Sequence, residues 1–301
     1  MNAATESMLT KKVNELNNLP AIPSVLSSLG ECLSQNASRV DIGRVVELIS
    51  YDKSLAMQCL RVANSALFRR RSNVETVREA VLALGLSRIR DLVYSCSLPK
   101  LFFDLKQGMP PVTFWRHALG TALISQHFAK RLSVENYEKL YLAGLLHDIG
   151  ILVNSLLFPE EFHKALVLAQ TSEIPLWEAE QQVLGFTHCE SGRVLADFWK
   201  LPPDIAEVIE FHHQPALASS APEMTAVVYL ADLLCRLRGL GYGYYEARQF
   251  DLASEESWQI LAKKHPAVAD LDVVRFTFEL EEFVTQVEGL VDSILGASSK
   301  N

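Results

Sequence analysis

The sequence has few of the features that mark an exported or membrane-spanning chain. It contains only five cysteines, an odd and widely scattered number with no C-x-x-C spacing. That pattern favours reduced, buried thiols over a disulfide framework or a zinc ribbon. The N-terminus lacks a charged-then-apolar signal pattern, and the apolar run AVVYLADLLC is short and interrupted by Asp232. We therefore expect a cytoplasmic protein. The five cysteines are Cys32, Cys59, Cys96, Cys189 and Cys235.

Alternation typical of strands is also lacking, and almost every segment has a helical period. Apolar residues over 40–68 recur at three-and-four spacing, and Asp41 and Asp52 stand where helix N-caps are expected. Gly85 separates two further short helices. The sequence predicts an all-α fold, with a helical N-terminal layer packed on a helical core and additional C-terminal helices.

The strongest break in the pattern is KQGMPP at 106–111. We therefore predict an N-terminal helical part over 1–108, a core over 109–240 and a C-terminal helical extension over 241–301. The longer helices are expected at 113–132, 137–149, 155–171, 176–199, 203–213, 223–238, 253–264 and 270–296.

The net charge of −8 is unevenly distributed. Residues 1–108 carry 14 Lys and Arg against 10 Asp and Glu, while residues 109–301 carry 14 against 26. The basic run RRR at 69–71 could contact an anionic partner, but a solvated loop is the favoured interpretation. A nucleic-acid partner is not expected, because the acidic chain as a whole would repel it.

Seven titratable residues interrupt the apolar faces of the helices after residue 109. A single histidine on an apolar face is usually a satisfied core residue. Together, however, imidazoles and carboxylates are the ligand set of Zn²⁺, Mn²⁺ or Fe ions, and facing helices can gather such a set. The sequence therefore predicts a metal site. Its candidate ligands are His117, His147, Asp148, His188, His212, His213 and Asp232.

Adjacent helical residues point about 100° apart, so His147 and Asp148 do not share a face within one helix. Near a helix end both can converge on an ion beyond the terminus. Asp148 could then bridge two ions, and a water between them would become a hydroxide able to attack a phosphate ester. His127, His163 and His265 are given no role.

The order His, His-Asp in LLHDIG, His, His-His and Asp resembles the HD superfamily of metal-dependent phosphohydrolases, and is most similar to its HDOD branch (HD-related output domains). LPAIPSVL, YDKSLAMQCLRVANSALF, AVLALGLSRIRDLV, FWRHALGTALIS and LGFTHCESGRVLADFWKLP extend the resemblance over about residues 18–240. It implies that His117, His147, Asp148 and His188 are ligands with Asp148 bridging. His212, His213 and Asp232 would complete a two-metal pocket.

The sequence departs from the catalytic HD-GYP relatives, which cleave cyclic di-GMP. They have a Lys directly after HDIG, where this chain has Ile151, and a Gly-Tyr-Pro signature after His-His, where this chain has QPALASSAPE. GYGYY at 241–245 lies too far downstream to be that signature. Some relatives also place a Glu for a third metal at the position of Thr113. The resemblance thus implies that ligands are largely kept while substrate-handling groups are missing.

Two functions remain open. The favoured hypothesis is a cytoplasmic signalling or regulatory protein that acts by protein contact, with one or two divalent ions (Fe, Mn or Zn) in its pocket and little or no hydrolysis. The alternative is an active phosphohydrolase for a phosphomonoester, nucleotide or cyclic dinucleotide, with Asp148 as the metal-bridging catalytic residue. A phosphate-containing ligand could enter the pocket in either case, no membrane partner is expected, and the oligomeric state is open. Purely structural histidines are a third, less favoured possibility.

Overall fold

The computed structural model describes residues 3–15, 28, 40–65, 73–102, 109–134, 137–242, 251–268 and 271–295. These residues are predominantly helical and include no strand, which confirms the all-α prediction. The chain divides into two compact units, and each consists of two separate stretches of sequence. The larger unit comprises Met1–Leu19 and Leu105–Val284, and the smaller unit comprises Pro20–Asp104 and Thr285–Asn301.

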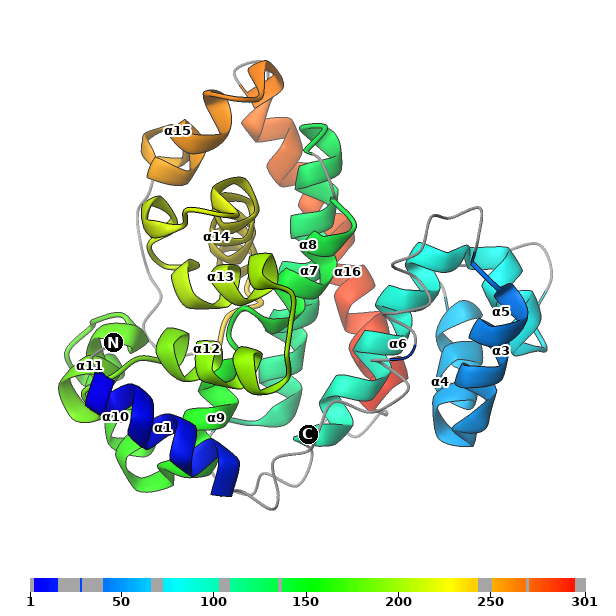
Figure 1. Ribbon diagram of the computed structural model, residues 1–301. Helices are drawn as coiled ribbons and strands as arrows, with labels where there is room; N and C mark the ends of the chain where they lie inside the picture. Colours follow the sequence, from blue (N-terminus) through cyan, green and yellow to red (C-terminus); the bar gives the residue numbers. More distant parts are fainter. Residues whose placement is uncertain are drawn as a thin grey trace. The chain divides into compact units, whose positions relative to one another are not determined.

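The smaller unit contains short amphipathic helices that begin where the sequence predicts. Asp41 caps α3, and Asp52 caps α4 by accepting hydrogen bonds from two of its first backbone N–H groups. Gly85 ends α5 with a φ of +81°, a conformation that favours glycine. The helices are α3 (Ile42–Tyr51), α4 (Lys53–Ala63), α5 (Val77–Leu84) and α6 (Leu86–Leu101), in blue to cyan in Figure 1.

The core of this smaller unit is almost wholly apolar. The last turns of α16 (Val273–Leu295) belong to it, and the Gln58 side chain donates a hydrogen bond to the backbone oxygen of Ile294 at 3.2 Å. The predicted basic run at 69–71 lies outside the described residues. Fully buried side chains include Val45, Ile49, Leu55, Cys59, Ile89 and Cys96.

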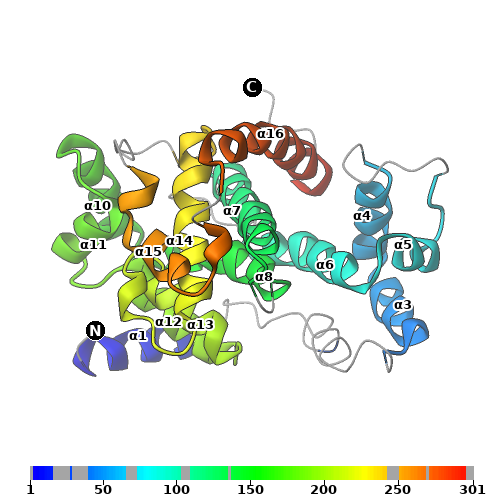
Figure 2. The ribbon, with the colours of Figure 1, turned by 90° about the horizontal axis from the view of Figure 1, so that it is seen from above.

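The larger unit is a helical bundle in which α7, α8 and α14 lie side by side and α9 packs on α12 (Figures 1 and 2). Proline opens α7, α10, α13 and α14, where its missing N–H costs nothing. The helices are α1 (Ala3–Glu15), α7 (Pro111–Arg131), α8 (Lys139–Leu146), α9 (Ile149–Leu157), α10 (Pro159–Thr171), α11 (Leu176–Val183), α12 (His188–Phe198), α13 (Pro203–Phe211), α14 (Pro222–Leu237), α15 (Glu256–Ala262) and most of α16.

Of the long helices predicted from the sequence, the one at 137–149 ends close to its predicted end, whereas those at 155–171 and 176–199 are each interrupted. The helix predicted at 137–149 ends at Leu146, and α9 begins after Asp148. The helix predicted at 176–199 is interrupted between α11 and α12. Its interruption has a local cause, since Gly185 takes a φ of +79° and Thr187 forms a capping box with Glu190. The α8–α9 junction and the start of α12 place three candidate ligands at helix ends.

A close approach between α9 and α12 brings their ends together. A Cβ atom on Gly150 would lie 1.8 Å from the backbone oxygen of His188 and 2.7 Å from the backbone nitrogen of Gly192. A Cβ on Gly192 would lie 2.7 Å from the Ile209 side chain. Only glycine fits at this contact, and the contact fixes the α8–α9 junction beside the first residue of α12.

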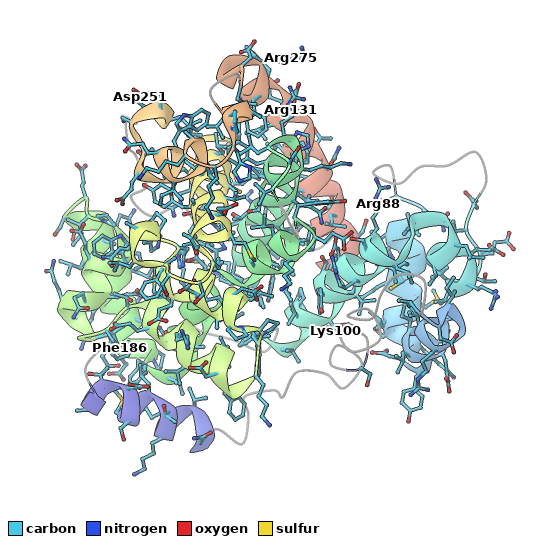
Figure 3. The ribbon with its side chains drawn as sticks, turned by 45° about the horizontal axis from the view of Figure 1, so that its top comes forward. Arg88, Lys100, Arg131, Phe186, Asp251 and Arg275 are labelled. Carbon is cyan, nitrogen blue, oxygen red and sulfur yellow. The ribbon has the colours of Figure 1, made fainter. Side chains whose placement is uncertain are left out.

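The N-terminal helix α1 packs on α12 within the larger unit, although nearly ninety residues of the smaller unit separate α1 from the rest of this bundle in sequence. Leu9 and Val13 of α1 are buried, and the Lys12 ammonium lies 4.5 Å from the centre of the Phe158 ring. That ring meets Phe186 edge to face at 5.2 Å. Phe186 is labelled near α1 in Figure 3.

Ion pairs between partly exposed side chains lie on the surface of the larger unit. Near the end of α7, Arg131 lies 3.6 Å from the Glu279 carboxylate, and Arg275 reaches the same carboxylate at 3.2 Å. Figure 3 labels both arginines. These exposed pairs contribute little to stability, so the fold depends mainly on its buried interior.

One stretch, Lys139–Leu157, is long and apolar enough by length and composition to cross a membrane. In the fold it comprises α8, the His147–Asp148 junction and α9, and 83% of its most apolar window is buried inside the protein. That degree of burial is typical of a core helix of a globular protein.

The three-part domain division predicted from sequence stays a prediction. The compact units follow a different division, because α1 groups with the 109–240 region and the end of α16 groups with the N-terminal helices.

Candidate metal centre

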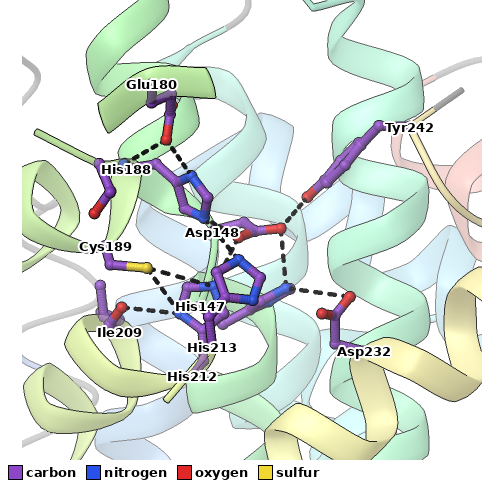
Figure 4. A network of polar contacts seen from close by, with 12 residues as sticks. His147, Asp148, Glu180, His188, Cys189, Ile209, His212, His213, Asp232 and Tyr242 are labelled. Atoms are coloured by element: carbon purple, nitrogen blue, oxygen red, sulfur yellow. Dashed lines mark hydrogen bonds and ion pairs between the residues drawn. The ribbon is translucent and has the colours of Figure 1, made fainter. Parts of the chain in front are cut away.

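All seven predicted ligands lie in the larger unit, and the fold brings them together (Figure 4). Six of them are at most 2% exposed, and only His213 is partly exposed. Besides α7 and α14, the α8–α9 junction, the start of α12 and the segment after α13 contribute residues. We call these seven residues the cluster: His117 in α7, His147 and Asp148 between α8 and α9, His188 at the start of α12, His212 and His213 after α13, and Asp232 in α14.

The Asp148 carboxylate lies at the centre of the cluster, and its two oxygens face different histidines. Its Oδ1 lies 3.2 Å from His188 Nε2 and 3.1 Å from His212 Nε2. Its Oδ2 lies 3.1 Å from His147 Nε2 and 3.8 Å from His117 Nε2. This is the arrangement of a carboxylate that can bridge two cations.

The cluster therefore has two sides. On the Asp232 side, Asp232 Oδ1 lies 3.0 Å from His117 Nε2 and 4.0 Å from His147 Nε2. On the His213 side, the Nε2 atoms of His188 and His213 lie 3.1 Å apart. We define the Asp232 side by His117, His147, Asp232 and Asp148 Oδ2, and the His213 side by His188, His212, His213 and Asp148 Oδ1.

Backbone carbonyls fix the tautomer of three histidines. The Nδ1 atoms of His117, His147 and His212 lie 2.9, 2.8 and 2.9 Å from carbonyl oxygens of Leu240, Gly144 and Ile209. A carbonyl oxygen can only accept, so each Nδ1 carries the proton and donates it. Where the imidazole is neutral, its Nε2 then directs a lone pair at a carboxylate oxygen. That contact is repulsive unless a proton or a metal ion lies between the two atoms.

A carboxylate orients the fourth histidine. Glu180 Oε2 lies 2.6 Å from His188 Nδ1 and accepts a hydrogen bond from the His188 backbone N–H at 2.8 Å. Its Oε1 accepts from the Asn154 side chain at 2.9 Å. Glu180 is fully buried in α11. Carboxylates that hold the second nitrogen of a metal-binding histidine are a recurrent feature of metal sites.

Sequence reasoning missed Glu180 because a single helix was predicted over 176–199. In that helix, Glu180 and His188 would lie two turns apart. A helix-capping signal could have found the pair. In FTHCE, Thr187 and Glu190 predict a helix start, and the turn before it returns His188 to Glu180.

Tyr242 is a second group that the sequence did not reveal. Its hydroxyl donates to Asp148 Oδ2 at 2.8 Å, and its ring lies 4.3 Å from the His117 ring. It stacks with Phe114 at 6.0 Å and is buried. The GYGYY stretch was predicted only as a loop, and its residues 243–245 lie outside the described part of the chain.

Arg236 pairs with Asp232 one turn away in α14. Its Nε donates to Asp232 Oδ1 at 2.8 Å, and a second guanidinium nitrogen contacts Oδ2. This pair explains how the carboxylate is tolerated inside AVVYLADLLC, because a buried charge requires a partner. The Asp-x-x-x-Arg spacing in the sequence is the signal that predicts it.

The two buried carboxylates of the cluster, Asp148 and Asp232, need positive charge close to them. Burial alone would raise the pKa of Asp148, but His147, His188 and His212 hold it well below its usual value. For Asp232, burial is likewise outweighed by Arg236 and His117, and its pKa is lowered. Both carboxylates are therefore ionised at neutral pH.

The histidines differ among themselves. Burial lowers the pKa of His147 and His213. Burial opposes the charged form of His188 as well, but Glu180 and Cys189 raise its pKa well above the usual value. Protons on part of the imidazoles thus supply the positive charge, at the positions where a cation would bind.

The donor atoms fit a metal centre. His117 Nε2, His147 Nε2 and Asp148 Oδ1 are buried and have no hydrogen-bond partner, which is costly unless a ligand satisfies them. Two sets of donor atoms lie mutually within 4.8 Å: His117, His147 and Asp148 in one, and His188, Cys189, His212 and His213 in the other. Imidazole and carboxylate donors suit Zn²⁺, Mn²⁺ and Fe ions alike. The residues present could hold two ions, although their assignment as ligands stays a prediction.

The structure also shows where a residue that departs from the catalytic relatives lies. Ile151 is fully buried in α9, so an apolar side chain packs at the position after HDIG. The histidines given no role are elsewhere: His265 lies 2.8 Å from Glu223, and His127 lies 3.8 Å from Glu279. His163 is on the exposed surface of α10.

Comparisons with known proteins agree with the resemblance found in the sequence. A protein of Treponema pallidum (strain Nichols) without an assigned function is 25% identical over 234 residues, or 77% of this chain, and this chain spans 45% of that protein. The structure of a protein of the same fold from Shewanella amazonensis SB2B, assigned provisionally as a phosphohydrolase, matches with a TM-score of 0.72 and 24% identity over 95% of this chain and 97% of the other.

An HDOD domain protein of unknown function from Geobacter sulfurreducens is more similar, with 28% identity and a TM-score of 0.84. The match covers 97% of this chain and 99% of the other. The family model described as the HDOD domain matches residues 19–215, well over half of the chain. The predicted family is therefore confirmed, and this chain belongs to the HDOD domain family.

Proposed function

We propose that this chain is a signalling or regulatory HDOD protein whose pocket holds one or two divalent metal ions and performs little or no hydrolysis. The burial of the cluster carries this proposal: six of its seven residues are at most 2% exposed. A phosphate ester would have to reach the centre of the cluster to be cleaved there. Ile151 offers no charge to such a substrate, and the Tyr242 hydroxyl already contacts Asp148 Oδ2.

A bound pair of ions would supply Lewis acidity and lower the pKa of a water molecule. His117, His147 and Asp232 would hold an ion on one side, and Asp148 would offer one oxygen to each side. In the proposed regulatory role the same contacts join α7, α8, α12, α13 and α14 through one centre. Metal binding would then stabilise the larger unit, as it does in structural metal sites.

The alternative is an active phosphohydrolase for a phosphomonoester, nucleotide or cyclic dinucleotide. One observation favours it: Asp148 directs one oxygen to each side, with histidine lone pairs opposite both. A protein that acts only by contact has no chemical reason to retain a bridging carboxylate. The provisional assignment of the Shewanella protein is consistent with this alternative, although at 24% identity it supports the fold alone.

The proposed setting is the cytoplasm, with signalling proteins as partners. Three strongly exposed apolar side chains in the smaller unit support contact with another protein: Tyr51, Met57 and Leu82 are 94%, 62% and 61% exposed. A phosphate-containing ligand could still bind at the pocket. Nucleic acid and membrane are not proposed as partners.

The deciding experiment measures metal content and turnover on the same samples. Wild-type protein purified without a tag or chelator should contain about one to two ions per chain, and Asp148→Ala less than about a tenth of an ion. Wild type loaded with Mn²⁺, Fe²⁺ or Zn²⁺ should not cleave p-nitrophenyl phosphate, bis(p-nitrophenyl) phosphate or cyclic di-GMP above the Asp148→Ala background.

Turnover that is present in the wild type and lost in Asp148→Ala would overturn the regulatory proposal in favour of the hydrolase. Metal-free wild type that does not take up added ions, with a folded helical spectrum, would overturn both.

A further inference from the structure

Cys189 lies beside the His213 side of the cluster and has no role in the function proposed above. It follows His188 at the start of α12 and is 8% exposed. Its Sγ lies 3.9 Å from Nδ1 and 4.0 Å from Nε2 of His212, as Figure 4 shows. Because His212 Nδ1 donates to the Ile209 carbonyl, its Nε2 is the atom left to share a ligand with the sulfur.

The donor atoms on this side have the spacing of a tetrahedral site. In a zinc site with Zn–N near 2.0 Å and Zn–S near 2.3 Å, neighbouring nitrogens lie ~3.3 Å apart and nitrogen and sulfur ~3.6 Å. Here His188 Nε2 and His213 Nε2 are 3.1 Å apart, and Cys189 Sγ and His212 Nε2 are 4.0 Å apart. All four donor atoms lie within 4.8 Å of one another.

A second observation directs a ligand to the same place. Asp148 Oδ1 is buried, has no hydrogen-bond partner, and lies 3.2 and 3.1 Å from His188 Nε2 and His212 Nε2. A cation on the His213 side would satisfy this oxygen together with the imidazole lone pairs. The sulfur therefore belongs to a set of donors, and is not an isolated thiol.

The other described cysteine of the larger unit provides the contrast. Cys235 is also buried, but its thiol donates to the backbone oxygen of His117 at 3.6 Å. It faces a carbonyl oxygen and no group of imidazole Nε2 atoms. Two buried cysteines near the same cluster thus differ in the atoms that their sulfurs face.

We propose that Cys189 is a thiolate ligand of a metal ion on the His213 side, with His188, His212 and His213 as the other three ligands. This inference rests on the proposed metal centre and refines it. A Cys-His₃ set with four protein ligands is the composition of a closed structural zinc site, whereas the Asp232 side offers only nitrogen and oxygen donors and suits harder ions such as Mn²⁺ or Fe²⁺. Asp148 Oδ1, which lies 3.2 and 3.1 Å from the Nε2 atoms of His188 and His212, would supply negative charge beside such an ion.

The two sides would consequently differ in metal preference and in role. Zn²⁺ on the His213 side would join the start of α12 to the end of α13. The closed ligand set leaves no open position there for a substrate, which agrees with a regulatory rather than a hydrolytic protein.

The test is a cobalt titration of the metal-free full-length protein, followed by absorption spectroscopy. Co²⁺ is bound by the same ligands as Zn²⁺, its visible bands report binding to any site, and a thiolate ligand adds a sulfur-to-cobalt charge-transfer band in the near ultraviolet. Wild type should show both. Cys189→Ser and Cys189→Ala should lose the near-ultraviolet band, keep the visible bands of the Asp232 side, and bind Zn²⁺ at least about tenfold more weakly.

Cys235→Ser is the matched control, and it should keep the near-ultraviolet band at full intensity. Visible bands without the near-ultraviolet band in wild type would overturn the thiolate ligand and leave the metal centre intact. A near-ultraviolet band that persists in both Cys189 variants would also overturn it. Absence of all cobalt bands in wild type would overturn the metal centre itself, and the thiolate ligand with it.

Discussion

The two units of this protein are built from similar helices, yet they differ in what their interiors contain. In the smaller unit, helix caps and apolar stripes lead to a conventional core, in which Cys59 and Cys96 are buried among aliphatic side chains. In the larger unit, the same kind of apolar stripes surround seven titratable residues, of which six are almost fully buried.

The two units differ in how they accommodate buried polar and charged side chains. A buried polar or charged group must find partners inside the protein. In the larger unit these partners are other members of the cluster, together with Glu180, Arg236 and Tyr242. Within the cluster itself, three buried atoms are still left without a hydrogen bond: His117 Nε2, His147 Nε2 and Asp148 Oδ1. Within the described residues, groups of side chains that could hold a metal ion are found in the larger unit alone, and a cation there would satisfy these three atoms.

The largest expected effect comes from removing the central carboxylate. Asp148→Asn should abolish metal binding, because an amide cannot supply charge to both sides of the cluster. Asp91→Asn, the matched change at a buried carboxylate of the smaller unit, should leave the metal content unchanged. Elemental analysis checks both.

Hydrogen exchange extends the same comparison to single helices. In wild type, added metal should slow the exchange of amides in α7, α12 and α14 and leave those of α3 and α4 unchanged, because only the larger unit contains the ligands. Equal slowing in both units would contradict this contrast.

The next largest effect is expected at the contact between α9 and α12. Gly150→Ala places a Cβ against the backbone oxygen of His188. A backbone atom cannot move aside as the end of a flexible side chain could. We expect a loss of about 3 kcal/mol or more in the free energy of unfolding, measured by urea denaturation. Metal affinity should fall as well, because the ends of the two helices separate.

Gly289→Ala is the matched control in α16, in the part assigned to the smaller unit. No atom lies within 4 Å of the Cβ position there, and the residue is exposed. Because alanine favours helix, this change should stabilise the protein by about 0.5–1 kcal/mol. A similar loss of unfolding free energy in both variants would show that the contact between α9 and α12 does not require glycine at position 150.

A smaller effect should follow from loss of the carboxylate that orients His188. Glu180→Gln keeps the size of the side chain but removes the charge next to Nδ1. We expect metal affinity to fall about 10–100-fold. Competition against a metal-sensitive dye measures it, and Glu178→Gln, in the same helix but partly exposed, should have wild-type affinity.

The smallest effect concerns a buried carboxylate away from the cluster. Burial tends to raise the pKa of Glu207, but backbone N–H groups of Ser219, Ser220 and Ala221 lower it below the usual value. A folded-state pKa below the unfolded value of about 4.3 means that its stabilisation is complete above that pH. The stabilisation is lost as the pH falls through the folded-state pKa.

Glu207→Gln should therefore lower the free energy of unfolding by about 1–2 kcal/mol at pH 7. It should also reduce the loss of stability that wild type shows between pH 5 and pH 3. Urea denaturation at both ends of that range measures the difference. Glu79→Gln, at an exposed carboxylate of the smaller unit whose pKa is lowered by the Glu75 backbone N–H, should have a smaller effect on this pH dependence.

Much of the fold was predictable because its signals are local. Asp41, Asp52 and Gly85 begin and end helices where the sequence predicted, since capping depends on a few adjacent residues. The single helices predicted at 155–171 and 176–199 are wrong for a complementary reason. Apolar periodicity continues through both breaks, and the capping box of Thr187 and Glu190 was not recognised.

The chemistry of the site was also present in the sequence. His, His-Asp, His, His-His and Asp predicted a ligand set, and the structure gathers all seven residues. Glu180, Cys189 and Tyr242 were not predicted as part of the site. The capping box of Thr187 and Glu190 is a local signal for the turn that brings His188 back to Glu180. No local sequence pattern specifies the contact of Cys189 with His212 or that of Tyr242 with Asp148.

The sequence by itself thus determined the family, the helical class and the kinds of donor atoms, because these depend on residue types and their spacing. Only the tertiary structure decided that Asp148 faces two sides, that Glu180 orients His188, and that Cys189 rather than Cys235 faces imidazole nitrogens. Those relations depend on how closely α9 and α12 approach at Gly150 and Gly192, and on where the segment after α14 returns. Packing of the whole bundle sets such distances.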